Sequence, residues 1–332
     1  MPHTRRAALG LFAGAAASFA ARPARADPRA EWAPTRPVRM VVPYPAGGPT
    51  DAIARHVAQD IAGSLGQNVI VENVAGASGA VGTRGVKRAE PDGHTIMLGN
   101  NQTHGSNMYL LRDPGYDAVA DFAPLAGAGA FEHVFVVRNT LPVRSMGELV
   151  DLARKEPGRL NYASTGAGSG SHLSTELFMA RTGTAMVHVP FRGAAPLVTE
   201  LMAGRVDLSN STLPSVLGQI QAGTVRAIGL ASPRRNRHVP EVATLREQGI
   251  ADADMESWTA FFAPARVPAP ALERLSREVM ASLARPQTRE ALDRIGFTVE
   301  PRDPAAFAPF QAAELRRVEE VIRAAKLARA EG

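Results

Sequence analysis

Short runs of apolar, β-branched residues alternate along the chain with segments whose apolar residues recur every three to four positions. Residues 38–44 read as a buried strand, and apolar residues then repeat at helical spacing from Ile53 to Leu65, until Gly66 ends the pattern. Alternation of this kind is typical of βα units that build a parallel sheet. The start of the chain therefore predicts an α/β fold.

The same alternation continues along the chain, and a second group of βα units starts near residue 133. Further strands are predicted at residues 68–72, 95–99, 133–138, 160–164, 186–189, 206–209, 225–231 and 258–263. Further helices are predicted at residues 80–89, 172–181, 195–203, 214–222, 269–284, 287–295 and 304–328, and a capping box at Ser145–Glu148 starts one more.

Two groups of βα units predict a bilobed α/β architecture, with two doubly wound, mostly parallel sheets joined by a hinge. We expect residues 27–130 plus 260–332 to form the first lobe and residues 131–259 to form the second. Open parallel sheets bind ligands beyond the carboxyl ends of their strands, so a ligand is expected between the lobes.

Composition supports a globular protein, because 45% of the 332 residues are hydrophobic and 21% are charged. The net charge of +5 invites a nucleic-acid function. However, four arginines and no acid lie in residues 1–26, and without those four the chain has 33 basic residues against 32 acidic ones. We therefore expect no nucleic-acid partner, and we expect a monomer.

The first 26 residues have the pattern of a secretory signal. A basic start precedes the apolar run 7–21, and the small-residue pattern Ala24-Arg25-Ala26 predicts cleavage after Ala26. The pair Arg5–Arg6 resembles a twin-arginine export signal, although general secretory signals also carry adjacent arginines. We expect a periplasmic protein, with the export route left open.

Several kinds of chemistry are excluded by residue types and spacing. The chain has no cysteine, which rules out thiol nucleophiles, disulfides and cysteine zinc sites. Its mature histidines never stand three or four positions apart, and its glycine turns match neither a dinucleotide-binding fingerprint nor a P-loop. We expect neither a metal nor another cofactor.

Four glycine-rich loops, each following a predicted strand and opening a helix, are the candidates for binding. They cover residues 44–51, 76–82, 164–172 and 189–196. Free N–H groups at a helix start favour an anion, although the same residues would also make ordinary turns. Asp51 in the first loop disfavours a polyanion, so a carboxylate or a zwitterion is expected. An exported serine hydrolase stays an alternative, in which Ser169 or Ser171 would act with His172.

Taken together, these loops resemble a known family, the periplasmic solute-binding receptors of tripartite tricarboxylate transporters, also called Bug receptors. The resemblance covers nearly all of the mature chain. The matching segments are Pro43–Gly48 with Asp51, Glu72-Asn73 with Gly76-Ala77 and Gly79–Gly82, Pro91-Asp92-Gly93, Thr165–Leu173 with Glu176-Leu177-Phe178, His188–Gly193, Val206-Asp207, and Trp258 with Ala263-Pro264.

The resemblance implies a Venus-flytrap receptor that closes on a small carboxylate without transforming it and delivers it to a two-component membrane permease. A receptor that serves a sensor protein stays an alternative. In the first lobe, the expected ligand contacts are Tyr44, Ala46, Gly47, Gly48, Asp51, Gly76, Ala77, Ser78, Gly79, Thr103 and His104. In the second lobe, they are Thr165, Gly166, Ser169, His172, Phe191, Arg192, Gly193 and, near the far end of the cleft, Asp207. Ser78 stands where the family often has glycine, which would add a hydroxyl to the pocket.

Overall fold

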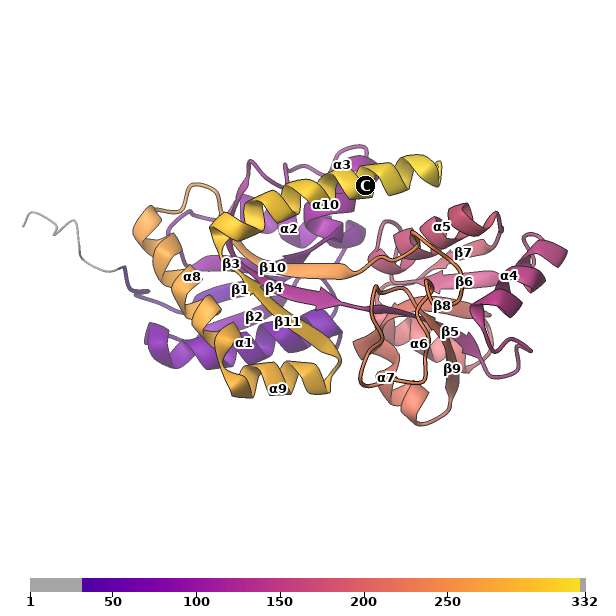
Figure 1. Ribbon diagram of the computed structural model, residues 1–332. Coiled ribbons are helices and arrows are strands. Elements are labelled where there is room, and N and C mark those ends of the chain that lie inside the picture. The colour runs from indigo at the N-terminus through magenta and orange to yellow at the C-terminus, as the bar shows by residue number, and fades with distance from the viewer. Residues whose placement is uncertain (1–31, 329–332) are drawn as a thin grey trace, which may run out of the picture. The chain divides into compact units, whose positions relative to one another are not determined.

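The computed structural model describes residues 32–328, and the signal segment predicted for residues 1–26 lies outside this range. The described chain contains two β-sheets (Figure 1). The first has the order β11-β4-β10-β3-β1-β2, with β1 (Val38–Val42), β2 (Val69–Asn73), β3 (Thr95–Asn100), β4 (Phe122–Phe131), β10 (Ser257–Pro264) and β11 (Phe297–Arg302). The second has the order β7-β6-β8-β5-β9, with β5 (His133–Arg138), β6 (Asn161–Ser164), β7 (Val187–Pro190), β8 (Leu208–Thr212) and β9 (Val225–Leu230). We call the two halves built on these sheets the first and the second lobe.

Both sheets are mixed, which corrects the expectation of mostly parallel ones. In the described part of the chain, β1 is parallel to β2 and β3, and β6 is parallel to β7 and β8. The other five pairings, made by β10, β4, β11, β5 and β9, are antiparallel. The alternation of strand and helix indicated the βα units but not the strands that return through the middle of each sheet.

Helices cover both faces of each sheet (Figure 1). In the first lobe, α1 (Pro49–Leu65), α8 (Ala269–Ala284) and α9 (Pro286–Arg294) pack on one face, and α2 (Ala80–Lys87) and α10 (Pro304–Ala324) pack on the other. In the second lobe, α4 (Met146–Lys155) and α5 (Gly170–Thr182) cover one face, and α6 (Ala194–Met202) and α7 (Leu213–Gln221) cover the other. A 3-10 turn η1 (Ala77–Gly79), a π-helical segment η2 (Gln102–Ser106) and the short α3 (Asn107–Leu110) complete the first lobe. None of the helices within residues 32–328 is long and apolar enough to cross a bilayer.

The helix boundaries follow local signals that the sequence contains. Helix α1 starts at Pro49, which needs no N–H partner in the first turn, and it ends at Gly66 with a left-handed φ of 71°. In α4, the Ser145 side chain accepts a hydrogen bond from the Glu148 N–H, as the predicted capping box requires. Helix α10 ends at Ala324, four residues before its predicted end.

Strands β4 and β11 were not predicted. Strand β4 is rich in glycine and alanine and lacks the β-branched residues typical of strands. Its small residues are explained by close packing. A Cβ at Gly127 would lie 2.8 Å from the Phe307 ring, and a Cβ at Gly129 would lie 2.0 Å from the Thr298 carbonyl of β11. Packing against α10 and β11, and not strand propensity, sets the residues of β4.

The chain passes between the lobes twice. Strand β4 continues through Glu132 into β5 of the second sheet, and a later loop returns the chain to β10 of the first sheet at Ser257. At this place, the His133 Nε2 and the Ser257 Oγ are 2.8 Å apart, so the two passages are joined by a hydrogen bond. The lobe limits at residues 130 and 260 remain a prediction.

Gly129→Ala is expected to destabilise the first lobe strongly, by about 3 kcal/mol or more, because its φ is 144° and a Cβ would overlap the β11 backbone. Gly63→Ala is the matched control, since a Cβ there meets nothing within 4 Å in helix α1. It should stabilise the protein by up to about 1 kcal/mol. Urea unfolding of the two variants measures the difference, and equal midpoints would contradict the packing described for β4.

Candidate ligand-binding cleft

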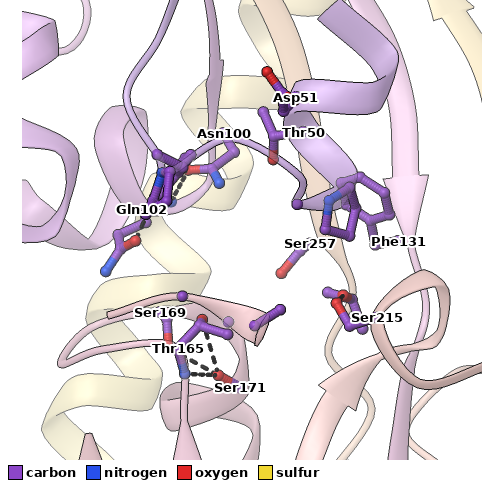
Figure 2. A pocket seen from close by; sticks show the side chains of 18 of the residues that line it. Thr50, Asp51, Asn100, Gln102, Phe131, Thr165, Ser169, Ser171, Ser215 and Ser257 are labelled. Atoms are coloured by element: carbon purple, nitrogen blue, oxygen red, sulfur yellow. Dashed lines mark hydrogen bonds between the residues drawn. The ribbon is translucent and has the colours of Figure 1, made fainter. Parts of the chain in front are cut away.

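Two adjacent cavities lie where the lobes face each other. The first is lined from both lobes, and Figure 2 shows Thr50, Asp51 and Gln102 on one side of it and Thr165, Ser169 and Ser171 on the other. The second lies beside it. The two share the following lining residues: Tyr44, Pro45, Gln102, Thr165, Arg192 and Gly193. The expected position of the site, between the lobes, therefore coincides with these two neighbouring cavities.

The N-termini of four helices line the first cavity. In α1, α5, α6 and α7, the first residues or the residue before them belong to its wall, namely Gly48 to Asp51, Ser169 to Ser171, Gly193 to Pro196, and Thr212 with Ser215. The first N–H groups of a helix have no partner within the helix, and the helix dipole adds partial positive charge there. Four helix starts, which favour an anion, thus lie along the wall of this cavity.

The turn between β1 and α1 is held by the carboxylate of Asp51. Its Oδ2 accepts from the Gly47 N–H and the Arg55 Nε, both at 3.0 Å, and its Oδ1 accepts from the Asn73 Nδ2 at 2.9 Å. Burial alone would raise the pKa of Asp51, but hydrogen bonds from Arg55, Gly47 and Asn73 outweigh it and lower that pKa. The carboxylate stays ionised and paired, and it positions the turn.

Tyr44 occupies the wall that both cavities share. Its hydroxyl donates to the Asn100 Oδ1 at 2.7 Å, and the Gln102 Oε1 lies 3.1 Å away. Burial raises the pKa of Tyr44 above its ordinary value, with the Asn100 hydrogen bond acting in the opposite direction. The phenol is therefore neutral, and its oxygen retains a lone pair.

The turn between β6 and α5 is fixed by its own serines. Ser171 Oγ accepts from the Thr165 N–H at 3.0 Å, and Ser169 Oγ accepts from the His172 N–H at 3.3 Å. The two serine oxygens are 2.9 Å apart. Gly166, with a φ of 133°, lets the chain fold back so that Thr165 and Ser169 both line the first cavity.

The geometry does not support the serine-hydrolase alternative at this turn. His172 Nδ1 accepts the Gly168 N–H at 3.0 Å, and its ring stacks on His188 with centroids 4.0 Å apart. Burial, and then the neighbouring His188, lower the pKa of His172 to about 3. Neither Ser169 nor Ser171 donates to this ring within the described residues, so the expected pairing of one of these serines with His172 is not formed.

Sequence reasoning missed the pair of Ser257 and His133, both of which line the first cavity. His133 Nδ1 lies 3.2 Å from the Asn210 carbonyl, which can only accept, so this nitrogen carries the proton and Nε2 accepts from the Ser257 hydroxyl. Burial lowers the pKa of His133 to about 4, so the ring is neutral at pH 7. The two residues are 124 positions apart, and no local pattern joins them.

Five of the expected contact residues line neither cavity, namely Gly47 in the turn before α1 and the four described next. Thr103 and His104 are fully buried in η2, and the His104 ring stacks on the Phe262 ring with centroids 3.8 Å apart. Of the residues of η2, Gln102 lines the first cavity instead. His172 faces His188 inside the second lobe, as described above. Asp207 precedes β8 and pairs with Arg138 at 2.9 Å.

The position of Asp207 has a simple geometric reason. The cavity lies at the opposite end of β8, at Thr212, and a five-residue strand is about 16 Å long. Asp207 therefore belongs to the outer end of the sheet.

The remaining expected residues are brought together at the cleft. Tyr44, Ala46, Gly48, Asp51, Thr165, Ser169, Arg192 and Gly193 line the first cavity, and Gly76, Ala77, Ser78, Gly79, Gly166 and Phe191 line the second. Gly47 lies in the same turn, with its N–H directed to Asp51. The Arg192 side chain is exposed at the boundary of the two cavities.

Two α/β lobes with helix N-termini converging on the space between them define a solute-binding receptor of the periplasmic-binding-protein class. The family described as the tripartite tricarboxylate transporter family receptor matches residues 53–327. The chain belongs to this family, which confirms the resemblance. It is a family of receptors and not of enzymes.

Individual relatives agree over nearly their whole length. Protein BugT of Bordetella pertussis (strain Tohama I) is 33% identical over 318 residues, which cover 96% of each chain. The R. palustris protein Rpa4515, solved with adipate, has a TM-score of 0.86 and 32% identity, and the match covers 90% of this chain and 99% of that one. MatC (Rpa3494) from Rhodopseudomonas palustris, solved with bound malate, has a TM-score of 0.82 and 32% identity, covering 87% and 99%. These similarities confirm the bilobed α/β fold.

Asp51→Asn should destabilise the protein at pH 7 by about 1–3 kcal/mol, because an amide cannot accept all three hydrogen bonds. The pKa of Asp51 is lowered on folding, so its contribution is present above its unfolded pKa of about 3.9 and is lost as the pH falls through the folded pKa. Urea unfolding at pH 7 and pH 3 should show that the difference in free energy of unfolding between wild type and variant is smaller at pH 3. Asp151→Asn, on the exposed face of α4, serves as the control. A stability difference between wild type and Asp51→Asn that does not depend on pH would refute the role of the Asp51 charge.

Proposed function

We propose that this protein captures a small organic carboxylate in the first cavity by lobe closure and delivers it to a two-component membrane permease from the periplasm. The observation that carries the proposal is the convergence of four helix N-termini on one cavity. Adipate and malate, bound by the two similar R. palustris proteins, are both organic acids of this class.

The charges of the lining favour an anion over a cation. Asp51 is the only acidic side chain among the described lining residues of the first cavity, and Arg55 and two further donors already pair with it. Arg192 adds a positive charge, while His133 is neutral at pH 7. A carboxylate would therefore meet backbone N–H groups, hydroxyls and one guanidinium, with no unpaired negative charge.

Lobe closure would make the ligand-bound receptor different in shape from the empty one. The donors of α1 belong to the first lobe, whereas those of α5, α6 and α7 belong to the second. One ligand can contact both groups only when the lobes approach each other, so the ligand stabilises the closed arrangement. A permease that recognises both lobes together would then distinguish loaded from empty receptor.

Gly48→Val tests the position of the ligand. Gly48 is the residue before α1, its φ of −84° suits any residue, and a Cβ would come no closer than 3.8 Å to protein atoms, at the Pro45 carbonyl. The valine side chain should fill part of the first cavity and weaken binding of adipate or malate by about tenfold or more, a cost of about 1.4 kcal/mol, while the fold stays stable.

Isothermal titration calorimetry of the mature protein with both acids measures the effect. Gly85→Val, where a Cβ meets nothing within 4 Å on helix α2, should keep the wild-type affinity. The proposal fails if Gly48→Val binds as tightly as wild type, or if a wider screen of organic acids finds no ligand at all.

A further inference from the structure

The turn that presents Thr165 and Ser169 is clipped to the first lobe by three side chains. Ser78 Oγ and Gln102 Nε2 both donate to the Ala167 carbonyl, at 3.1 Å and 2.9 Å. Ser106 Oγ donates to the next carbonyl, that of Gly168, at 2.6 Å. We call these three hydrogen bonds the interlobe clip, because every donor is in the first lobe and both acceptors are in the second.

Ser78 reaches this carbonyl from a backbone conformation that favours glycine. Its φ is 54° and its ψ is 36°, and Ala77 before it has a φ of 45°. A left-handed residue with a Cβ is strained, and such strain persists only where surrounding contacts hold it. Here the Asn107 Nδ2 holds the Ser78 carbonyl at 3.0 Å while the hydroxyl holds Ala167.

The clip acts on the anion-binding turn itself. Ala167 and Gly168 lie between Gly166, which lines the second cavity, and Ser169, which precedes α5 and lines the first. Gly168 packs against the first lobe as well, since a Cβ there would lie 3.0 Å from Leu110. Fixing these two carbonyls therefore fixes the register of the turn against the opposite lobe.

The geometry points to Ser78 as a positioning residue for ligand capture, which holds the Thr165–Ser169 turn in its binding position when the lobes are closed. This inference rests on the proposed function. Separation of the lobes would leave the Ser78 hydroxyl and the Ala167 carbonyl to water, so their bond favours only the closed arrangement. The apparent affinity for a ligand rises with the fraction of protein that is competent to bind it. The added hydroxyl expected to face the ligand is used, in this structure, to join the lobes.

Two substitutions separate this role from a role in folding. Ser78→Ala and Ser78→Gly both remove the hydroxyl, but only glycine relieves the left-handed strain. Both variants should bind adipate about 3- to 10-fold more weakly than wild type, as expected for the loss of one hydrogen bond, with faster dissociation. Without ligand, Ser78→Gly should melt at a higher temperature than Ser78→Ala.

Calorimetry and stopped-flow dissociation measure the binding, and Ser64→Ala is the control. The Ser64 hydroxyl bonds within its own helix, to the Ile61 carbonyl, and its loss should leave the affinity unchanged. A merely structural role for Ser78 would make affinity follow melting temperature. The inference is overturned if either Ser78 variant binds like wild type, or if Ser78→Gly restores the affinity that Ser78→Ala loses.

A distance measurement tests the clip without any ligand. The chain has no cysteine, so Arg88→Cys in the first lobe and Ala203→Cys in the second, both exposed, can carry a pair of spin labels. Removing the Ser78 hydroxyl should broaden the label-to-label distance distribution toward longer distances. An unchanged distribution contradicts the clip, whereas a failure of all carboxylates to bind the wild type would contradict the proposed function and leave the clip itself unaffected.

Discussion

The meeting of the N-termini of α1, α5, α6 and α7 at one cavity is the constraint on which the cleft depends. Each of these helices follows a strand or a short turn, and the βα connections bring their N-terminal residues to one cavity. Donors that are withdrawn from water need acceptors, and no single side chain of the cleft could serve all four helix starts. The turns around them are consequently built from glycine, serine and threonine, which leave the backbone accessible.

Much of the fold and of the cleft could be predicted from the sequence, because both depend on local patterns. The loops at 44–51, 76–82, 164–172 and 189–196 were found by a strand signal, a glycine-rich turn and a helix signal in succession. The structure brings most of their residues to the two cavities. Strand β4 was not predicted because its small residues are required by close packing against α10 and β11, which come more than 150 positions later in the chain.

Long-range contacts also explain the site residues that the sequence misjudged. His104 looks like a polar residue near a strand end, yet Phe262 from β10 covers its ring and buries it. Asp207 looks like a cleft acid, yet the direction of β8 places it at the far edge beside Arg138. His133 and Ser257 gave no signal because only the return of the chain at β10 brings them together.

Helix α10 adds a non-covalent connection between the lobes to the two covalent ones. Val318, Val321 and Ile322 of this helix pack with Leu173 and Leu177 of α5, the same helix whose start lines the first cavity. When the cleft opens, these apolar surfaces have to slide past one another or separate into water. The C-terminal helix thus connects the two lobes through apolar packing, and this packing restricts how far the lobes can separate.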